Sequence, residues 1–108
     1  MRIIDEELLA SFSGAGRCEF CGKASQQRHA HHVHSRGSGR LDIAINIVSL
    51  CPMCHADAHA GVTTRYEFLA IIAVREGIMQ DAIVAEIHRL RRADKDGNEP
   101  KRPKRGEP

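Results

Sequence analysis

Aromatic residues are scarce in this sequence, which has no tryptophan, one tyrosine and three phenylalanines among its 108 residues. Proteins that hold single-stranded nucleic acids usually stack successive bases on aromatic rings. The composition therefore does not support a stacking platform for single strands.

Long apolar runs are also missing. A transmembrane helix needs roughly 20 consecutive apolar residues, and no segment of the sequence approaches that length. The chain turns acidic at Asp5, where the apolar part of a signal peptide would begin. We therefore expect a cytoplasmic protein with no signal peptide and no membrane partner.

Large apolar side chains are few before Val62, so a core built from that part alone would be marginal without an added constraint. Two Cys-x-x-Cys pairs can supply it, namely Cys18 with Cys21 and Cys51 with Cys54. In a reducing cytoplasm such pairs predict zinc ligands before disulfides. Four thiolates close the coordination shell, so we expect a structural Zn²⁺ site. The alternative, a redox-active pair, lacks the strand-and-helix context that it needs.

Positive charge is concentrated at one end of the chain, although the net charge is only +2. Residues 88–108 contain eight Lys and Arg against four Asp and Glu. This basic end suits a polyanion such as DNA, and it is equally typical of a solvated tail. Because Gly97 and three prolines follow Asp94, we expect residues 94–108 to be disordered.

The periodicity of apolar residues predicts short helices and strands. We expect helices over residues 3–12, 52–60, 65–76 and 80–92, and strands over residues 29–35 and 47–50. Residues 13–16 should end the first helix, residues 17–22 should form a zinc knuckle, and residues 23–29 should be a polar linker. The buried stripes of the last two helices should be Phe68, Leu69, Ile71, Ile72 and Val74, then Ile83, Val84, Ile87 and Leu90.

Six of the seven histidines lie between residues 29 and 59. His31 and His32 should point to opposite faces of a strand, so one can bind a metal while the other stays free of it. His55 and His59 are four residues apart and should share one helical face. Metal-assisted phosphodiester hydrolysis needs such a metal beside a separate imidazole that accepts a proton from water. The alternative is that these histidines only decorate the surface of a zinc module.

Residues 18–61 resemble the HNH endonucleases of the zinc-bearing ββα-metal type, or His-Me finger. The likeness rests on two knuckles around a His-His strand, an asparagine in the loop between them, and a helix that begins Cys-x-x-Cys-His. The resemblance implies an α+β fold with a small ββα-metal core, held by a four-cysteine zinc site and flanked by helices. We expect an N-terminal helix in residues 1–17, the nuclease core in 18–61, a helical extension in 62–93 and a basic tail in 94–108.

Carried over by position, the resemblance makes His31 and His55 ligands of a catalytic divalent ion and His32 the general base. Asn46 corresponds to the residue that orients this base through its side-chain amide. His59 has the spacing of a further helical ligand in colicin-type members. In zinc-bearing relatives such as the phage junction resolvases, only the residue after the last cysteine binds the ion. A helix-capping or phosphate-contacting role for His59 therefore stays open.

Several neighbouring residues lie outside this pattern. We expect His29 and His34 at the surface. Arg36 and Arg40 flank a glycine-rich loop, and we expect them to bind DNA phosphates, because guanidinium groups bind phosphate through paired hydrogen bonds. We expect Asp42 to be a loop residue rather than a metal ligand.

The resemblance implies a metal-dependent endonuclease that hydrolyses phosphodiester bonds and nicks double-stranded DNA, of a kind common in phage and prophage genomes. Its catalytic ion would be Mg²⁺, Mn²⁺, Ni²⁺ or Zn²⁺. The rival hypothesis is a non-catalytic zinc module that binds DNA or a protein partner. A nuclease directed at RNA, the oligomeric state, and a phage or host protein partner stay open.

Overall fold

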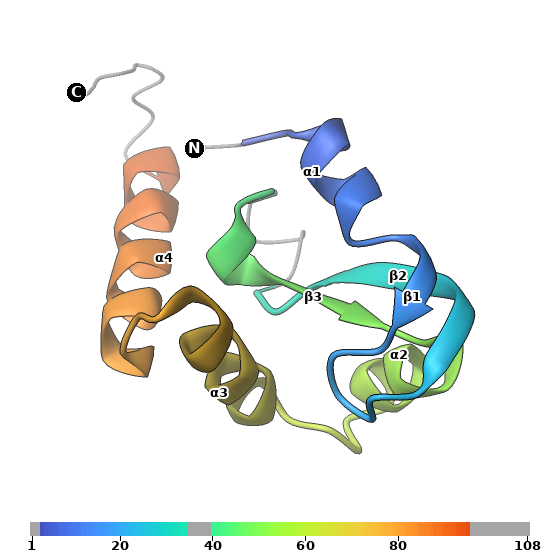
Figure 1. Cartoon of the computed structure of the whole chain (residues 1–108). Helices are drawn as coiled ribbons and strands as arrows, with labels where there is room; N and C mark the ends of the chain where they lie inside the picture. The colour runs from blue at the N-terminus through green and yellow to red at the C-terminus, as the bar shows by residue number, and fades with distance from the viewer. Residues whose placement is uncertain (1–2, 35–39, 96–108) are drawn as a thin grey trace.

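The computed structural model describes residues 3–34 and 40–95, with side chains placed up to Arg92. Arg36 and most of the basic tail lie outside the described residues. Figure 1 shows the elements in chain order. They are α1 (Glu6–Ser11), β1 (Gly14–Arg17), β2 (Ala24–His32), the 3-10 turn η2 (Ala44–Asn46), β3 (Ile47–Leu50), α2 (Pro52–His59), α3 (Arg65–Glu76) and α4 (Gln80–Lys95).

The three strands form one antiparallel sheet in the order β1-β2-β3. In the register of β2 and β3, His31 lies opposite Val48 and His32 lies opposite Ile47. Helix α2 follows β3 directly and packs against both β2 and β3, which completes a ββα unit (Figure 1). The expected α+β fold with a small ββα core is confirmed.

The sequence pattern does not predict β1 or the first half of β2, where it suggests the end of a helix and a polar linker. Both segments are polar and largely exposed, so they lack an apolar alternation. Arg28 holds them together by donating hydrogen bonds to the carbonyl oxygens of Gly14 and Ser13, at 3.1 and 3.0 Å. Gly16 leaves room for this side chain, because a Cβ there would lie 2.6 Å from the Arg28 Nε.

The N-terminal helix is shorter than the sequence suggests. Helix α1 begins after Asp5, whose side chain accepts a hydrogen bond from the Leu8 amide at 3.0 Å and so caps the helix. Ile3 instead forms a parallel bridge with Leu41. The segment before α1 is therefore extended and is tied to the segment that leads into η2.

The two helices after the ββα unit follow the predicted bounds closely. Helix α3 opens with a capping box between Thr64 and Glu67 and ends at Gly77, whose φ of 68° lies in the left-handed region. Helix α4 continues to Lys95. The prediction that Val74 is buried is wrong, because its side chain is 86% exposed.

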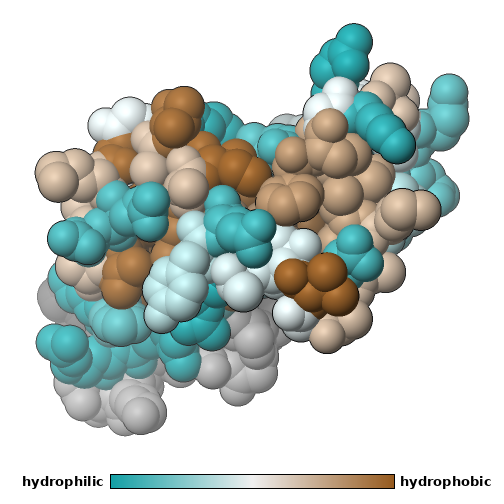
Figure 2. Space-filling view, turned by 90° about the horizontal axis from the view of Figure 1, so that it is seen from below, coloured by the Kyte–Doolittle hydropathy of each residue, from teal (hydrophilic) through white to brown (hydrophobic). Residues whose placement is uncertain are grey.

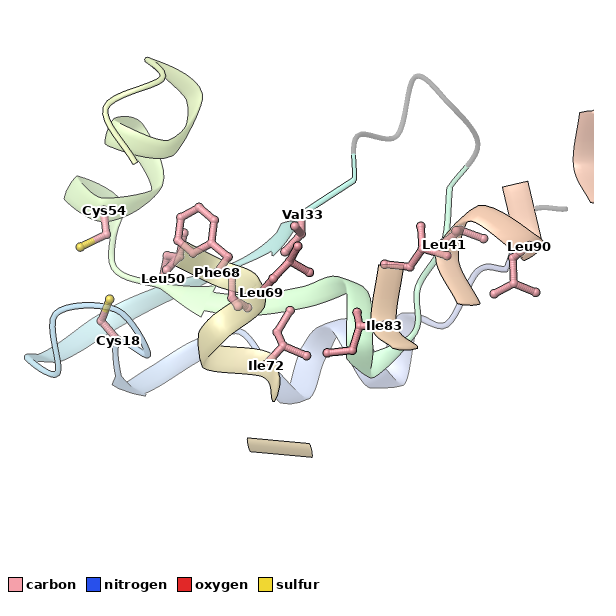
Figure 3. Close-up of a cluster of buried hydrophobic side chains, with 12 residues drawn as sticks. Cys18, Val33, Leu41, Leu50, Cys54, Phe68, Leu69, Ile72, Ile83 and Leu90 are labelled. Atoms are coloured by element: carbon pink, nitrogen blue, oxygen red, sulfur yellow. The ribbon is translucent and has the colours of Figure 1, made fainter. Parts of the chain in front are cut away.

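The hydrophobic core lies between β3, α3 and α4 and reaches two of the cysteines at one end (Figure 3). Phe68 of α3 is central to it. The Phe68 ring centroid lies 5.8 Å from that of Phe20 in the first zinc knuckle and 5.3 Å from that of His31 on β2. Helix α3 therefore joins the knuckle to the histidine-bearing strand.

Several large apolar side chains are exposed in the described part of the chain, among them Met53, Val62 and Met79. Seen from below, hydrophobic patches are separated by hydrophilic and intermediate side chains (Figure 2). No single apolar patch therefore dominates this face. No described helix combines the length and the apolar character needed to cross a membrane.

Candidate metal centres and catalytic site

The four cysteines come together where the two knuckles meet, at the start of α2. One ligand atom from each of Cys18, Cys21, Cys51 and Cys54 lies within 4.8 Å of the others, and none of the four forms a disulfide. Cys51 directly precedes α2, and Pro52 at the first helical position fixes the turn between the second pair. The arrangement is consistent with a four-coordinate zinc site.

Electrostatics around the cysteines favour thiolates that share a cation. Burial would raise the pKa of Cys18, but hydrogen bonds from backbone amides outweigh it and lower that pKa to about 6. Two of these donors are the amides of Phe20 and Cys21, each 3.4 Å from the Cys18 sulfur. Burial and the neighbouring sulfurs raise the pKa of the Cys54 thiol. A bound Zn²⁺ would relieve this repulsion and complete the site.

Three histidines form a second cluster on the same ββα unit. Ligand atoms of His31 from β2 and of His55 and His59 from α2 lie within 4.8 Å of one another. The Nε2 atoms of His55 and His59 are 3.0 Å apart. Burial, together with the neighbouring His55 and His59 side chains, lowers the pKa of His31 to about 4. Burial also lowers the pKa of His55. The lowered pKa values of His31 and His55 favour the neutral imidazole, which is the form that binds metals.

His29 supports this cluster from the same face of β2. Its Nδ1 lies 2.8 Å from the Nδ1 of His55, so it engages one ring nitrogen of His55 and leaves the other to face His59. Such contacts fix the orientation of a metal-binding imidazole. His29, expected at the surface, is half-buried and contacts His55. Its spacing of two residues from His31 was the available signal, because it places both on one face of a strand.

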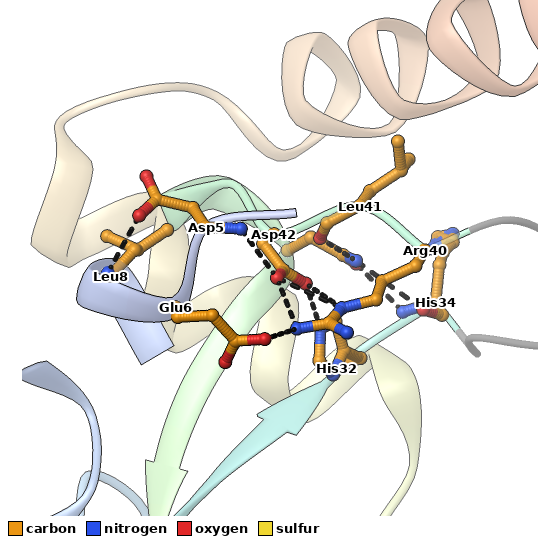
Figure 4. Close-up of polar contacts among 9 residues, drawn as sticks. Asp5, Glu6, Leu8, His32, His34, Arg40, Leu41 and Asp42 are labelled. Carbon is orange, nitrogen blue, oxygen red and sulfur yellow. Dashed lines mark hydrogen bonds and ion pairs between the residues drawn. The ribbon is translucent and has the colours of Figure 1, made fainter. Parts of the chain in front are cut away.

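His32, the residue after His31 on β2, contacts a buried carboxylate. Its Nε2 lies 2.8 Å from the Oδ1 of Asp42, and both side chains are almost inaccessible, at 9% and 0% exposure (Figure 4). Burial would raise the pKa of Asp42, but hydrogen bonds from Arg40, the Asp5 amide and His32 outweigh it and lower the pKa to about 2. Asp42 is therefore ionised and acts only as an acceptor.

Asp42 is the residue that the sequence interpretation missed. It sits in the segment Leu-Asp-Ile-Ala-Ile from residue 41 to residue 45, and an acid between such apolar residues can signal a buried carboxylate. Arg40 reaches the same group, with its Nη2 2.8 Å from Asp42 Oδ2 and 3.3 Å from Glu6 Oε2. The guanidinium expected to bind DNA is therefore already engaged, and it is only 12% exposed.

Asn46 has a different set of contacts from the one that the resemblance implies. Its side-chain oxygen accepts a hydrogen bond from the His34 amide at 2.8 Å, and its nitrogen donates to the Leu41 carbonyl at 3.0 Å. The side chain is completely buried. Asn46 thus ties together the backbone on both sides of residues 35–39, while Asp42 is the residue that contacts the His32 ring.

An open cleft of about 650 Å³ runs along this part of the molecule. His31, His55 and His59 line it together with His32, and Arg65 at the start of α3 lies on its wall. The structure thus gathers the histidines that the sequence singled out around one cleft. His34 is not among them, and it is buried rather than at the surface, with 3% exposure.

The ββα unit, with a cysteine cluster and an open histidine cluster that could each hold a metal ion, is a small domain of the ββα-metal type. The family model described as HNH endonuclease matches residues 18–61. The matched segment contains both clusters, and over these residues the predicted resemblance to HNH endonucleases is confirmed. No curated protein and no solved structure is significantly similar to the chain.

Proposed function

We propose that the chain is a metal-dependent endonuclease that hydrolyses phosphodiester bonds of double-stranded DNA, cutting one strand at a time. The observation that carries the proposal is that His32, held by a buried carboxylate, lines the same cleft as His31, His55 and His59. The family match supports nuclease chemistry, since HNH nucleases act on nucleic acids.

The three clustered histidines would hold one divalent ion. Their mutual closeness and the lowered pKa of His31 and His55 fit that role. Such an ion stabilises the negative charge that develops on the scissile phosphate and on the leaving oxygen. Imidazole nitrogens suit Mn²⁺, Ni²⁺ and Zn²⁺, and Mg²⁺ is the further candidate that the resemblance implies. Because His59 is within reach of both other rings, we propose it as a third ligand.

His32 would act as the general base. Because the Asp42 carboxylate is ionised, the Nε2 of His32 must carry the proton of their hydrogen bond. The Nδ1 of His32 then has a free lone pair and takes a proton from water. The water oxygen attacks phosphorus, the bond from phosphorus to the 3′-oxygen breaks, and that oxygen takes a proton from solvent. The products are a 5′-phosphate and a 3′-hydroxyl, and Asp42 stabilises the protonated His32.

The rival is a non-catalytic zinc module that binds DNA or a protein partner. It would need the four cysteines, but it would need neither a second cluster of metal ligands nor a buried pair of His32 and Asp42. The presence of both favours the nuclease. A phage or prophage setting, and a phage or host protein partner, remain proposals based on the resemblance.

Nicking of a supercoiled plasmid tests the function directly. The purified protein is treated with a chelator mild enough to leave the tetrathiolate zinc bound, and Mg²⁺, Mn²⁺, Ni²⁺ and Zn²⁺ are added back singly. We expect metal-dependent conversion to open circle, and loss of that conversion in His32→Ala with unchanged zinc content. Unchanged cleavage by His32→Ala would sink the assignment. A labelled RNA duplex in a parallel reaction separates DNA from RNA as the substrate.

A further inference from the structure

Three basic side chains on the two helices outside the ββα unit lie near His34. They are Arg65 at the start of α3, which lines the cleft, and His88 and Arg91 on α4, and we call them the α3–α4 basic surface. His34, in the segment after β2, is buried beside it. The ring of His34 lies 6.0 Å from that of His88, nearly perpendicular to it.

The state of His34 shows how positive this surface is. Burial, together with the charges of Arg65, Arg91 and His88, lowers the pKa of His34 to about 4. Its Nδ1 is buried and has no hydrogen-bond partner in the described part of the chain. No acidic side chain appears among the groups that act on it. Among the residues whose side chains the structure describes, no acid therefore offsets the positive charge around His34.

The arginines of this surface differ from most other described arginines. Five of those, Arg17, Arg28, Arg40, Arg75 and Arg89, donate hydrogen bonds to carboxylates or backbone carbonyls. Within the described residues, Arg65 and Arg91 form no ion pair and no side-chain hydrogen bond, and neither does the neighbouring Arg92. Arg65 is exposed and Arg91 half-buried, so both can take a ligand without breaking an existing interaction.

The position of Arg65 connects this surface to the candidate active site. Arg65 lines the same cleft as His31 and His59. A polyanion whose phosphate lies at the histidine cluster would therefore pass Arg65 as it leaves the cleft. Among polyanions, DNA is the substrate of the proposed function.

We propose that Arg65, Arg91 and His88 bind the DNA backbone at a phosphate group next to the one that is cleaved. This inference rests on the proposed function. Guanidinium groups bind phosphate oxygens through paired hydrogen bonds, and contacts of this kind position a duplex without reading its sequence. The α3–α4 basic surface thus takes the role that the sequence suggested for Arg40, which is engaged by Asp42 and Glu6.

Salt-dependent binding of a fluorescein-labelled duplex of about 25 base pairs tests the inference without relying on cleavage. Fluorescence anisotropy gives the dissociation constant at a series of NaCl concentrations, and every variant carries His32→Ala to prevent cutting. We expect Arg65→Ala and Arg91→Gln each to weaken binding about 3- to 10-fold near physiological salt. The slope of log K against log salt should fall by about 0.9 for each phosphate group that the variant no longer neutralises. Arg91→Lys should retain most of the slope.

Arg89→Ala is the matched control, since Arg89 lies on the same helix but is paired with Glu86. It should change neither affinity nor slope. Circular dichroism and zinc content confirm that each variant is folded. Equal slopes for Arg65→Ala, Arg91→Gln and Arg89→Ala would overturn the inference, even if the plasmid is nicked. If the slopes of Arg65→Ala and Arg91→Gln fall as expected but the unaltered protein does not nick the plasmid, only the proposed function is refuted. If polyglutamate displaces the labelled duplex as strongly as unlabelled duplex does, that result indicates an acidic protein partner and also overturns the inference.

Discussion

The two metal-ligand clusters of this molecule share one short ββα unit but differ in chemistry and in access. The cysteine cluster brings four thiolates together, which fill a tetrahedral shell and leave no position for a substrate. The histidine cluster offers three imidazoles on the wall of an open cleft. One cluster can therefore secure the fold while the other remains available for chemistry, so the loss of a ligand from each should have a different consequence.

Replacing a cysteine should have the largest effect. In Cys18→Ser the zinc site loses a ligand whose side chain is only 2% exposed. Structural zinc contributes about 10–16 kcal/mol in zinc-finger peptides, comparable to or larger than the usual stability of a domain of about 5–15 kcal/mol. We expect loss of bound zinc and of the cooperative unfolding transition, measured by metal analysis and circular dichroism. A folded Cys18→Ser protein would show that the cysteine cluster is not what secures the fold.

Replacing a ligand of the histidine cluster should leave the fold intact and remove activity. In His31→Ala we expect zinc content and the far-ultraviolet spectrum to be unchanged. Plasmid nicking should fall by about 1,000-fold or more, because the ion supplies several kcal/mol of transition-state stabilisation. Calorimetric titration with Mn²⁺ should show one binding event fewer than in the unaltered protein. If His31→Ala also released its structural zinc, the two clusters would not be independent.

Much of this difference could be predicted from the sequence, because it depends on local spacing. The Cys-x-x-Cys pairs and the four-residue step from His55 to His59 bring their ligands together through a turn and a helix alone. The partner of His32 could not be predicted in that way. Asp42 reaches His32 because Ile3 pairs with Leu41, a contact between distant segments that no local pattern reports.

Strand β1 could not be predicted either, because no local pattern marks it. Its residues from Gly14 to Arg17 are small or polar and mostly exposed, so no apolar face marks them as a strand. Their place in the sheet depends on the side chain of Arg28, which lies across the glycines. Where long-range polar contacts determine the structure, hydrophobic periodicity carries no signal.

The contact between His32 and Asp42 can be tested separately from metal binding. Its loss should reduce activity less than loss of the catalytic ion does. Asp42→Asn replaces an acceptor by a side chain that can also donate, so it no longer fixes the proton on the Nε2 of His32. We expect kcat to fall about 100-fold with KM little changed, since general base catalysis contributes about 10²–10⁴-fold. The ¹⁵N chemical shifts of His32 should show a mixture of tautomers, which a purely structural role for Asp42 would not produce.

The matched control is Glu6→Gln, because Glu6 also contacts Arg40 but its side chain is 75% exposed. It should leave kcat and the tautomer of His32 unchanged, since exposed ion pairs contribute little. A 100-fold loss of kcat in Asp42→Asn without any change in the His32 spectrum would contradict the positioning role. The loss would then have to come from disturbance of Arg40 and the segment around it.

The smallest effect concerns the pH dependence of stability and a buried histidine outside both clusters. It distinguishes the contribution of this buried ring from that of the metal ligands. His34 is 3% exposed, and its pKa is lowered to about 4 from an ordinary value of 6.5. Between these two values the unfolded chain binds a proton that the folded chain does not, so the free energy of unfolding must fall as the pH falls. From pH 7 to pH 5 this one group should lower the free energy of unfolding by about 2 kcal/mol, and His34→Gln should abolish that part of the loss.

Urea unfolding at both pH values, with zinc content measured in parallel, checks the prediction for His34. If His34→Gln kept the full pH dependence, the acid sensitivity would lie in the metal clusters, whose thiolates and imidazoles also gain protons in acid.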